Sequence, residues 1–237
     1  MVKTLLADIE MCCKIHSLEA LLTLNLAETL PFKVDEFSFP IIVIRNPAPL
    51  GFAANHNQAF AKSSGQFFCV VNPDIRLHKN IFPALLDCLQ DTSIGVAAPL
   101  VVGEQGEIED SARRFPTPFK ILCKAFGGCR GGDYAVKDEV IFPDWVGGMF
   151  MLFHRETFKA LGGFDERYFL YYEDVDLCAR LTLHGYKIAL CPTAQVVHHA
   201  QRSSHRNLKY LTWHVTSMMR FFCSPPFLKI RWRRLMQ

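Results

Sequence analysis

The strongest chemical signal in the sequence is an acidic, aromatic segment at residues 163–176, Gly-Phe-Asp-Glu-Arg-Tyr-Phe-Leu-Tyr-Tyr-Glu-Asp-Val-Asp. Five carboxylates lie among bulky aromatic side chains over these fourteen positions. Unpaired carboxylates are costly to bury, so such a cluster favours a cleft that faces a metal or a substrate hydroxyl. The alternative is a structural cluster of helix-capping residues and salt bridges.

Two further segments place polar residues at the end of an apolar run. Val70-Val71-Asn72-Pro73-Asp74 reads as a strand that presents Asp74 at its carboxyl end, the edge at which open α/β sheets bind ligands. A carboxylate there can hold Mg²⁺ or Mn²⁺, although Asn-Pro-Asp alone is more typical of a turn. Val196-Val197-His198-His199 is a similar run, but a lone histidine at a strand end is more often structural than a ligand.

Composition excludes several classes of protein. The chain has 237 residues, half of them apolar, which is enough for one large core. A net charge of +3 is too small to indicate a nucleic-acid partner. The nine cysteines are odd in number and contain no Cys-x-x-Cys pair, so we expect reduced thiols in the cytoplasm. Asp8 and Glu10 interrupt any signal peptide, and no segment has the apolar length of a membrane span.

Strand-like and helix-like segments alternate along the chain, which predicts an α/β sheet. The expected strands are residues 18–24, 41–44, 66–71, 95–101 and 186–190, and the run at 41–44 is expected to be buried. The expected helices are residues 5–13, 52–63, 80–90, 155–161, 173–184 and 206–222. Residues 103–144 read as loops around a short helix near 118–126, on an acceptor side.

Together and in this order, the motifs resemble the inverting glycosyltransferases of family 2, which have the GT-A fold. The resemblance covers about residues 40–205 and is greatest to a rhamnosyltransferase-like branch of bacterial surface polysaccharide synthesis. It implies a Rossmann-like mixed, mostly parallel sheet flanked by helices in a domain at 1–205, and then a helix and basic tail at 206–237. The matching residues are Arg45-Asn46, Gly51 to Asn57, Asn72-Pro73-Asp74, Gly147-Gly148-Met149, Gly162 to Glu166, Glu173 to Arg180, Pro192 and His198.

The resemblance implies that a sugar, with rhamnose from a dTDP donor as the best match, passes from a nucleotide sugar to a glycan or lipid-linked acceptor. Asp174 corresponds to the general base, with Glu173 and Asp165 beside it. Asp74 and His198 would hold a divalent metal, Mg²⁺ or Mn²⁺, on the donor diphosphate. The implied donor contacts are Asn25, Asn46, Gly51, Phe52, Asn55, Asn57, Asn72 and Asp74, and the implied acceptor contacts are Trp145, Gly147, Gly148, Asp165, Glu166 and Glu173. Arg180 is expected to pair with one of the acids.

The amino terminus departs from the family pattern. Family members begin with an apolar strand, whereas this chain starts on a predicted helix, so the first strand is missing. Thr23-Leu24-Asn25 replaces the family's Val-Asp-Asn, which leaves Asn25 rather than Leu24 to contact the donor. Loss of a central strand would cost more than the about 5–15 kcal/mol that holds a domain together. We therefore expect a misplaced start rather than a truncated copy with impaired donor binding.

The last residues mix cations with bulky apolar side chains, from Phe227 to Leu235. This composition suits an anionic membrane and predicts peripheral contact on the inner face of the cytoplasmic membrane, with a solvated tail as the alternative. Two other functions stay open. One is a noncatalytic remnant that binds a glycan or partner, and the other is a glycoside hydrolase, which uses paired carboxylates but needs neither Asn-Pro-Asp nor His198.

Overall fold

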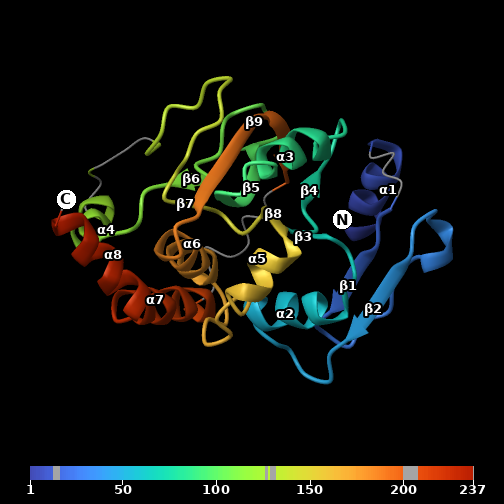
Figure 1. The fold of residues 1–237 in the computed structure, drawn as a ribbon. Coiled ribbons are helices and arrows are strands. Elements are labelled where there is room, and N and C mark those ends of the chain that lie inside the picture. Colours follow the sequence, from blue (N-terminus) through green and yellow to red (C-terminus); the bar gives the residue numbers. More distant parts are fainter. Residues whose placement is uncertain (13–16, 126–127, 129–131, 200–207, 237) are drawn as a thin grey trace.

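The computed structural model describes residues 1–12, 17–125, 128, 132–199 and 208–236 (Figure 1). Its helices are α1 (Val2–Cys12), α2 (Phe52–Lys62), α3 (Phe82–Leu89), α4 (Pro118–Ala125), α5 (Arg155–Ala160), α6 (Glu173–Leu183), α7 (Leu208–Phe222) and α8 (Pro225–Leu235), with a 3-10 turn at Val34–Glu36. Its strands are β1 (Ala20–Leu24), β2 (Ile41–Arg45), β3 (Phe67–Val71), β4 (Ile75–Arg76), β5 (Ile94–Val102), β6 (Ala112–Arg113), β7 (Trp145–Val146), β8 (Phe150–His154) and β9 (Lys187–His198).

The central sheet has five strands in the order β3-β8-β5-β9-β4. Strands β5 and β9 are parallel, whereas β8 is antiparallel to both β3 and β5, and β4 is antiparallel to β9. Strands β3, β5 and β9 therefore share one direction, and the predicted α/β architecture is confirmed as a mixed sheet. Strand β9 runs well past the expected end at residue 190 and carries the chain to His198.

Two apolar layers cover the two faces of this sheet. Met151 and Phe153 of β8 join α2, α5 and α6 in one cluster, and Phe150 and Leu152 join α1 and α3 in the other. This alternation is the two-residue period of a strand that is buried on both faces. Each large side chain buried in this way contributes about 1.5–3 kcal/mol to the free energy of folding. The sheet therefore holds the residues at its strand ends in stable positions.

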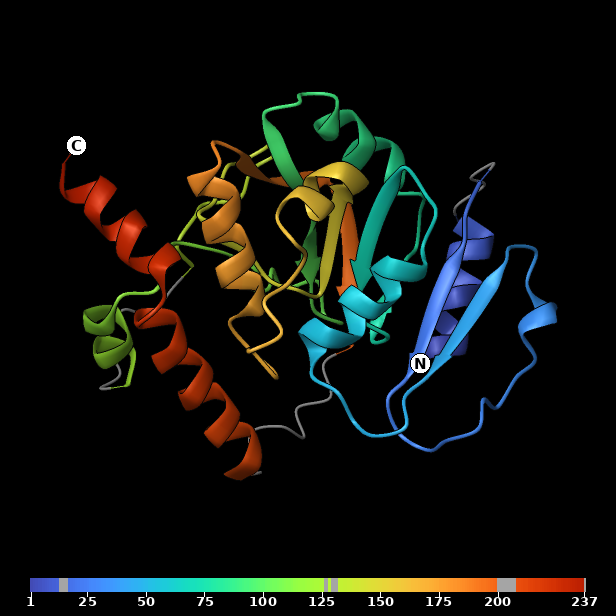
Figure 2. The same ribbon diagram turned by 60° about the horizontal axis from the view of Figure 1, so that its bottom comes forward.

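Strands β1 and β2 form a separate parallel pair beside α1, and Figure 2 shows this pair standing apart from the central sheet. Within the described residues, no other strand pairs with the free edge of β1 or of β3. An apolar cavity of about 610 Å³ lies here, lined by residues of α1, β1, α2 and β3.

The expectation that residues 41–44 are a buried strand is wrong in part. Only Ile44 of β2 is buried, and Ile42 is 36% exposed. The physical reason is that β2 is the outer strand of a two-stranded sheet, so one of its faces meets solvent.

The C-terminal residues fold back onto the domain. The expected tail at 227–235 lies in α8, which Ser224 caps by accepting a hydrogen bond from the Phe227 N–H at 3.4 Å. Phe227 and Ile230 are buried and share the core with Phe221 of α7. The solvated-tail alternative is therefore wrong for the buried side of α8. Residues 206 and 207 of the helix expected at 206–222 lie outside the described residues.

Among the cysteines, the sulfur atoms of Cys88 in α3 and Cys191 in β9 lie against each other. Their Cα atoms are 7.3 Å apart, beyond the usual disulfide range of about 4.4–6.8 Å. The five other described cysteines form no disulfide. The sequence predicted reduced thiols and gave no sign that these two, 103 residues apart, would meet.

Candidate active site

Pairing of β4 with β9 brings Asp74 and His198 together at one edge of the sheet. Ile75 lies opposite His198 in the register, so the preceding Asp74 reaches the imidazole. His198 Nε2 lies 3.3 Å from Asp74 Oδ2, and His198 Nδ1 lies 2.8 Å from Glu109 Oε2. Asp74 Oδ1 is buried without a hydrogen-bond partner. The expected Asp74–His198 pair is thus formed, and Glu109 joins it.

The carboxylates of Asp74 and Glu109 favour a positive charge between them, at His198. The hydrogen bond with Asp74, and then the bond and charge of Glu109, raise the pKa of His198 to about 9 against the lowering effect of burial. The imidazole therefore carries a proton at neutral pH and supplies the positive charge itself. A metal ion bound by Nε2 would take over the place of that proton.

The side chains at this edge of the sheet fit a hard divalent cation. They offer carboxylate and imidazole donors, one of which is the unpartnered Asp74 oxygen. The 3.3 Å between Nε2 and Oδ2 is close to the about 3 Å between adjacent ligands of an octahedral Mg²⁺. Among the described residues, no group of three or more His, Cys, Asp or Glu forms a complete metal-binding set. The remaining positions would go to phosphate and water.

Asp174 begins α6 and is held by backbone donors. Its Oδ2 accepts the Gly148 N–H at 2.9 Å and its Oδ1 accepts the Val175 N–H at 2.8 Å. Burial raises the pKa of Asp174, and these N–H groups and the charge of Arg113 lower it, with a net rise. The side chain is still partly exposed, so a substrate hydroxyl can reach it.

An unusual backbone turn places this helix. Tyr171 and Tyr172, directly before α6, have φ angles of 69° and 68°. The left-handed conformation costs a residue with a side chain about 1–2 kcal/mol. Residues strained in this way cluster at functional sites. Here the turn orients the first residues of α6 toward Gly148.

Glu173 differs from its neighbour in being closed off from solvent. It is 5% exposed, and its Oε2 has no hydrogen-bond partner. Burial, and then the charge of Asp174, raise the pKa of Glu173 well above its usual value. Its burial does not fit the predicted acceptor contact or a role as a second base.

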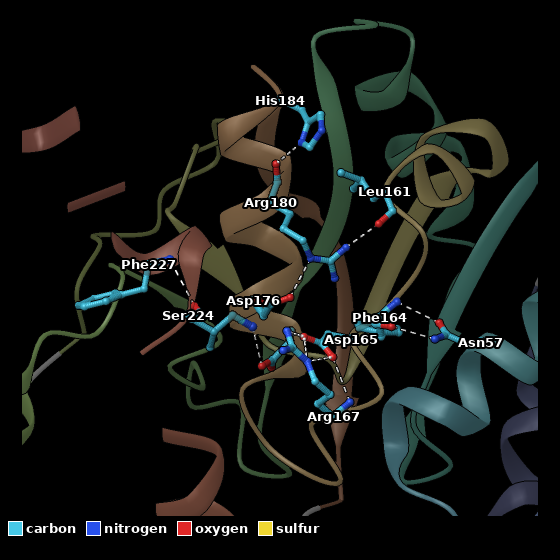
Figure 3. A network of polar contacts seen from close by, with 12 residues as sticks. Asn57, Leu161, Phe164, Asp165, Arg167, Asp176, Arg180, His184, Ser224 and Phe227 are labelled. Carbon is cyan, nitrogen blue, oxygen red and sulfur yellow. Dashed lines mark hydrogen bonds and ion pairs between the residues drawn. The ribbon is translucent and has the colours of Figure 1, made fainter. Parts of the chain in front are cut away.

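Two other acids of the segment, Asp165 and Asp176, pair with arginines, as Figure 3 shows. Arg167 holds both oxygens of Asp165, with Nη2 at 2.6 Å and Nε at 2.9 Å. Burial raises the pKa of Asp165, but these bonds outweigh it and keep the pKa low. Arg180 binds Asp176 at 2.8 Å, which confirms that it pairs with an acid. Asp165 therefore stabilises the loop, and the predicted catalytic and acceptor roles do not fit its paired oxygens.

Asn57 has a structural task that the sequence did not reveal. Its amide accepts the Phe164 N–H at 2.9 Å and donates to the Phe164 carbonyl at 2.8 Å (Figure 3). It also donates to Glu166 at 3.0 Å. These bonds fasten the acidic segment to α2 and occupy the amide predicted to contact the donor. Glu166 is exposed and stays open to an acceptor.

Gly51 and Gly148 allow the start of α2 to pack closely against the acidic segment at residues 163–176. The Phe52 N–H donates to the Phe169 carbonyl at 2.8 Å, and a Cβ on Gly51 would lie 2.5 Å from that oxygen. A Cβ on Gly148 would lie 3.4 Å from the Phe52 ring and 3.6 Å from Asp174 Cβ. The predicted residues Gly51, Phe52, Gly148 and Asp174 therefore meet in one place.

His56, which the sequence analysis did not select, is packed beside this contact. Its ring lies 4.3 Å from that of Phe52 and 6.1 Å from that of Phe164. Burial lowers the pKa of His56 to about 4, so the ring is neutral and supports the loop at Phe52 by packing.

Three asparagines predicted to contact the donor meet where β1 and β2 end. Asn46 Nδ2 donates to Asn25 Oδ1 at 2.9 Å and to Asn55 Oδ1 at 2.7 Å, and Asn25 also binds the Leu50 backbone. Asn46 Oδ1 is buried without a partner. Asn72, at the end of β3, donates its backbone N–H to the Met149 carbonyl at 2.9 Å. The structure thus groups the first three and places Asn72 next to Asp74.

The predicted acceptor residue Trp145 lies in β7, which pairs with β6 as a two-stranded antiparallel sheet, and Gly147 follows β7 directly. Trp145 Nε1 donates to the Arg114 carbonyl at 3.1 Å, the Arg113 guanidinium lies 5.4 Å from the Trp145 ring centre, and the Gly147 N–H donates to the Ser111 carbonyl at 2.9 Å. Arg113 and Glu109 were missed by the sequence analysis. Their only signal is charge within an irregular segment, which does not reveal what they contact.

The fold and the site define a class, that of GT-A glycosyltransferase domains. One similar solved structure is the mannosyltransferase PcManGT from Pyrobaculum calidifontis in complex with GDP-Man and Mn²⁺, with a TM-score of 0.61 and 17% identity over 96% of this chain and 63% of that one. Another is GalNAc-T7 with UDP, GalNAc and Mn²⁺, with a TM-score of 0.57 and 19% identity over 76% and 37% of the chains. At these identities the likeness concerns the fold alone.

The sequence comparisons give the family. The model of the family described as "Glycosyltransferase like family 2" matches residues 32–217, and the chain belongs to this family. It is 33% identical over 148 residues to the N-acetylglucosaminyl-diphospho-decaprenol L-rhamnosyltransferase of Mycobacterium tuberculosis, over 58% of this chain and 48% of the relative. It is 26% identical over 195 residues to rhamnosyltransferase WbbL of Escherichia coli K12, over 76% and 73%. The chain spans about half the length of the M. tuberculosis relative.

Proposed function

We propose that this protein transfers a sugar from a nucleoside diphosphate donor to a hydroxyl group of a glycan or lipid-linked acceptor, with inversion at the anomeric carbon. The observation that carries the proposal is the position of Asp174. Asp174 is a partly exposed residue, the pKa of its carboxyl is raised, and the Gly148 N–H orients this carboxyl next to the loop at Phe52.

In the reaction, Asp174 removes the acceptor hydroxyl proton as that oxygen attacks the anomeric carbon. The bond from this carbon to the diphosphate breaks, and its electron pair leaves with the nucleoside diphosphate. A raised pKa makes Asp174 a stronger base than an ordinary aspartate, and the Gly148 and Val175 N–H groups keep its oxygens in place. Asp74 and His198 would hold Mg²⁺ or Mn²⁺, which neutralises charge on the leaving diphosphate.

The donor that we propose is dTDP-rhamnose or a similar nucleotide sugar. Its support is the likeness to proteins named as rhamnosyltransferases in M. tuberculosis and E. coli. The name of the first relative also includes a diphospho-decaprenol carrier, which supports a lipid-linked acceptor. Asn25, Asn46 and Asn55, close to the loop at Phe52, are proposed to contact the nucleotide.

We further propose peripheral contact with the inner face of the cytoplasmic membrane. Among the described residues, no helix is both long and apolar enough to cross a bilayer. Leu211 and Met219 of α7 and Trp232 and Leu235 of α8 are 55–73% exposed. The cations of α8 lie between such residues, at positions 229, 231, 233 and 234. Exposed apolar and cationic side chains on one pair of helices suit an anionic lipid surface.

Vesicle sedimentation tests the membrane contact. The wild-type protein should pellet with vesicles that contain phosphatidylglycerol and remain in solution with phosphatidylcholine alone. Trp232→Glu with Leu235→Glu should weaken binding without loss of fold, since both side chains are exposed. Equal binding of this variant and the wild type would contradict the contact.

A second candidate is a noncatalytic protein that binds a glycan or a partner without turnover. Burial of Glu173 and pairing of Asp165 with Arg167 favour it, because they remove two of the expected catalytic acids from the site. A panel of nucleotide sugars, with Mn²⁺ and with or without acceptor, separates the two candidates. Release of nucleoside diphosphate that depends on the acceptor supports transfer, and a panel in which no donor is consumed supports the noncatalytic protein. The glycoside hydrolase alternative has no support in the family match.

A further inference from the structure

A short loop after β5 supplies a carboxylate to each of the two histidines at the end of β9. Glu109 Oε2 lies 2.8 Å from His198 Nδ1, and Glu104 Oε1 lies 2.9 Å from His199 Nδ1. The loop is pinned by backbone bonds from the Glu109 N–H to the Val101 carbonyl and from the Gly103 N–H to the Glu107 carbonyl. Only the imidazole of the first pair contacts the Asp74 carboxylate, whereas His199 donates its backbone N–H to the Asp74 carbonyl at 2.9 Å.

We propose that Glu109 is a positioning residue that holds His198 in the orientation needed to bind the divalent cation. The inference rests on the proposed function and deepens it. Glu109 accepts a hydrogen bond from Nδ1–H, which directs Nε2 toward the Asp74 carboxylate, whose other oxygen, Oδ1, is buried without a partner. In the metal-bound state Nε2 must offer a lone pair, and a carboxylate on Nδ1 fixes that tautomer and strengthens the nitrogen as a donor.

The position of His198 explains why such support is needed. The residue ends β9, so the strand constrains its ring from one side only. Among the described residues, its two ring nitrogens contact the carboxylates of Asp74 and Glu109. Without Glu109 the ring could rotate and present Nδ1 to the cation. The side chains of Glu109 and His198 are 26% and 15% exposed, which limits competition from water.

Glu104 provides a matched control. It makes the same kind of bond to the next histidine, from the same loop, but its side chain is 63% exposed and does not touch Asp74 or His198. A general change in the charge or stability of the loop would affect Glu104→Gln and Glu109→Gln alike. If Glu109 positions His198, only Glu109→Gln should weaken Mn²⁺ binding.

Mn²⁺ binding to the purified full-length chain, without sugar or nucleotide, tests the proposal by calorimetry or by the loss of the free Mn²⁺ resonance signal. Removal of the carboxylate in Glu109→Ala should weaken binding about 10–100-fold. Glu109→Gln should lose less, because the amide oxygen can still accept from Nδ1, and Glu104→Gln should bind as the wild type does. Thermal unfolding of each variant shows whether the fold is kept. If Glu109→Ala is unfolded, the Mn²⁺ affinity of Glu109→Gln is compared with that of the wild type instead.

Wild-type affinity in both Glu109 variants would overturn the proposal, as would an equal loss in Glu104→Gln. Absence of Mn²⁺ binding in the wild type would overturn it too. Transfer activity measured in excess chelator then shows separately whether sugar transfer itself stands, so the two failures are distinguishable.

Discussion

Replacement of Asp174 by asparagine removes the proposed base and nearly nothing else. The side chain keeps its size, but an amide has one oxygen in place of two. It can therefore accept from either the Gly148 N–H or the Val175 N–H, and not from both with the present geometry. The expected chemical effect is a fall in the rate of transfer of about 10²–10⁴-fold, the contribution typical of general base catalysis.

The cost of this substitution to the fold should be small. Leaving one of these two N–H groups without its partner costs about 1–3 kcal/mol of folding free energy. Burial disfavours the charged form of Asp174, as its raised pKa shows, so removal of that charge offsets part of the cost. For a chain of this size each kcal/mol lowers Tm by about 2–4 °C, so the variant should stay folded at 25 °C. Donor affinity should change little, since Asp174 faces the acceptor side in the proposed reaction.

The assay is release of nucleoside diphosphate in the presence of acceptor, with donor affinity measured separately by calorimetry. Asp91→Asn is the control, because Asp91 is exposed and pairs weakly with Lys187 at 3.9 Å, away from the site. A variant at position 174 with nearly full activity would refute the assignment. Loss of donor binding equal to the loss of rate would show that the side chain has a structural role instead.

Three other predictions concern stability and motion. Burial raises the pKa of Glu173, so the stability that this group contributes is full below its unfolded pKa of 4.5 and is lost as pH rises through its folded pKa. Tm should therefore fall less between pH 5 and 8 in Glu173→Gln than in the wild type. An equal change of Tm with pH in the two proteins would contradict this. Gly51→Ala should cost about 1–3 kcal/mol and reduce activity, because its Cβ would lie 2.5 Å from the Phe169 carbonyl oxygen. Gly132→Ala, whose Cβ would meet no atom closer than 3.7 Å, is the control in thermal unfolding, and equal losses would count against the close contact. Amide hydrogens of β1 and β2 should exchange faster than those of β5 and β9, because the pair stands apart from the central sheet, and equal protection would contradict that separation.

The regular part of the fold was predictable from local pattern. Apolar runs gave β3 and β5, helical spacing gave α1 and α2, and Gly185, with φ of 88°, marked the end of α6. The pattern did not tell an inner strand from an outer one. Strand β2 has the composition of a buried strand, yet its exposure depends on which strands lie beside it, and that is not a local property.

The candidate site was predictable in its residue types and less so in its contacts. Asp74 and His198 were paired on family resemblance, and the β4–β9 register is what brings them together. Glu109 reaches His198 across 89 positions of sequence, and Asn57 reaches Phe164 across 107, so neither contact leaves a local trace. The left-handed backbone at Tyr171 and Tyr172 was equally hidden, since tyrosine rarely adopts it.

The central claim is inverting transfer of a sugar by a base at Asp174. Its most direct test is the anomeric configuration of the product, followed by nuclear magnetic resonance as wild-type enzyme acts on a nucleotide sugar with Mn²⁺ and acceptor. The account predicts a product of opposite anomeric configuration to the donor and no product with Asp174→Asn. A product that retains the donor configuration, or equal product from Asp174→Asn, would contradict it.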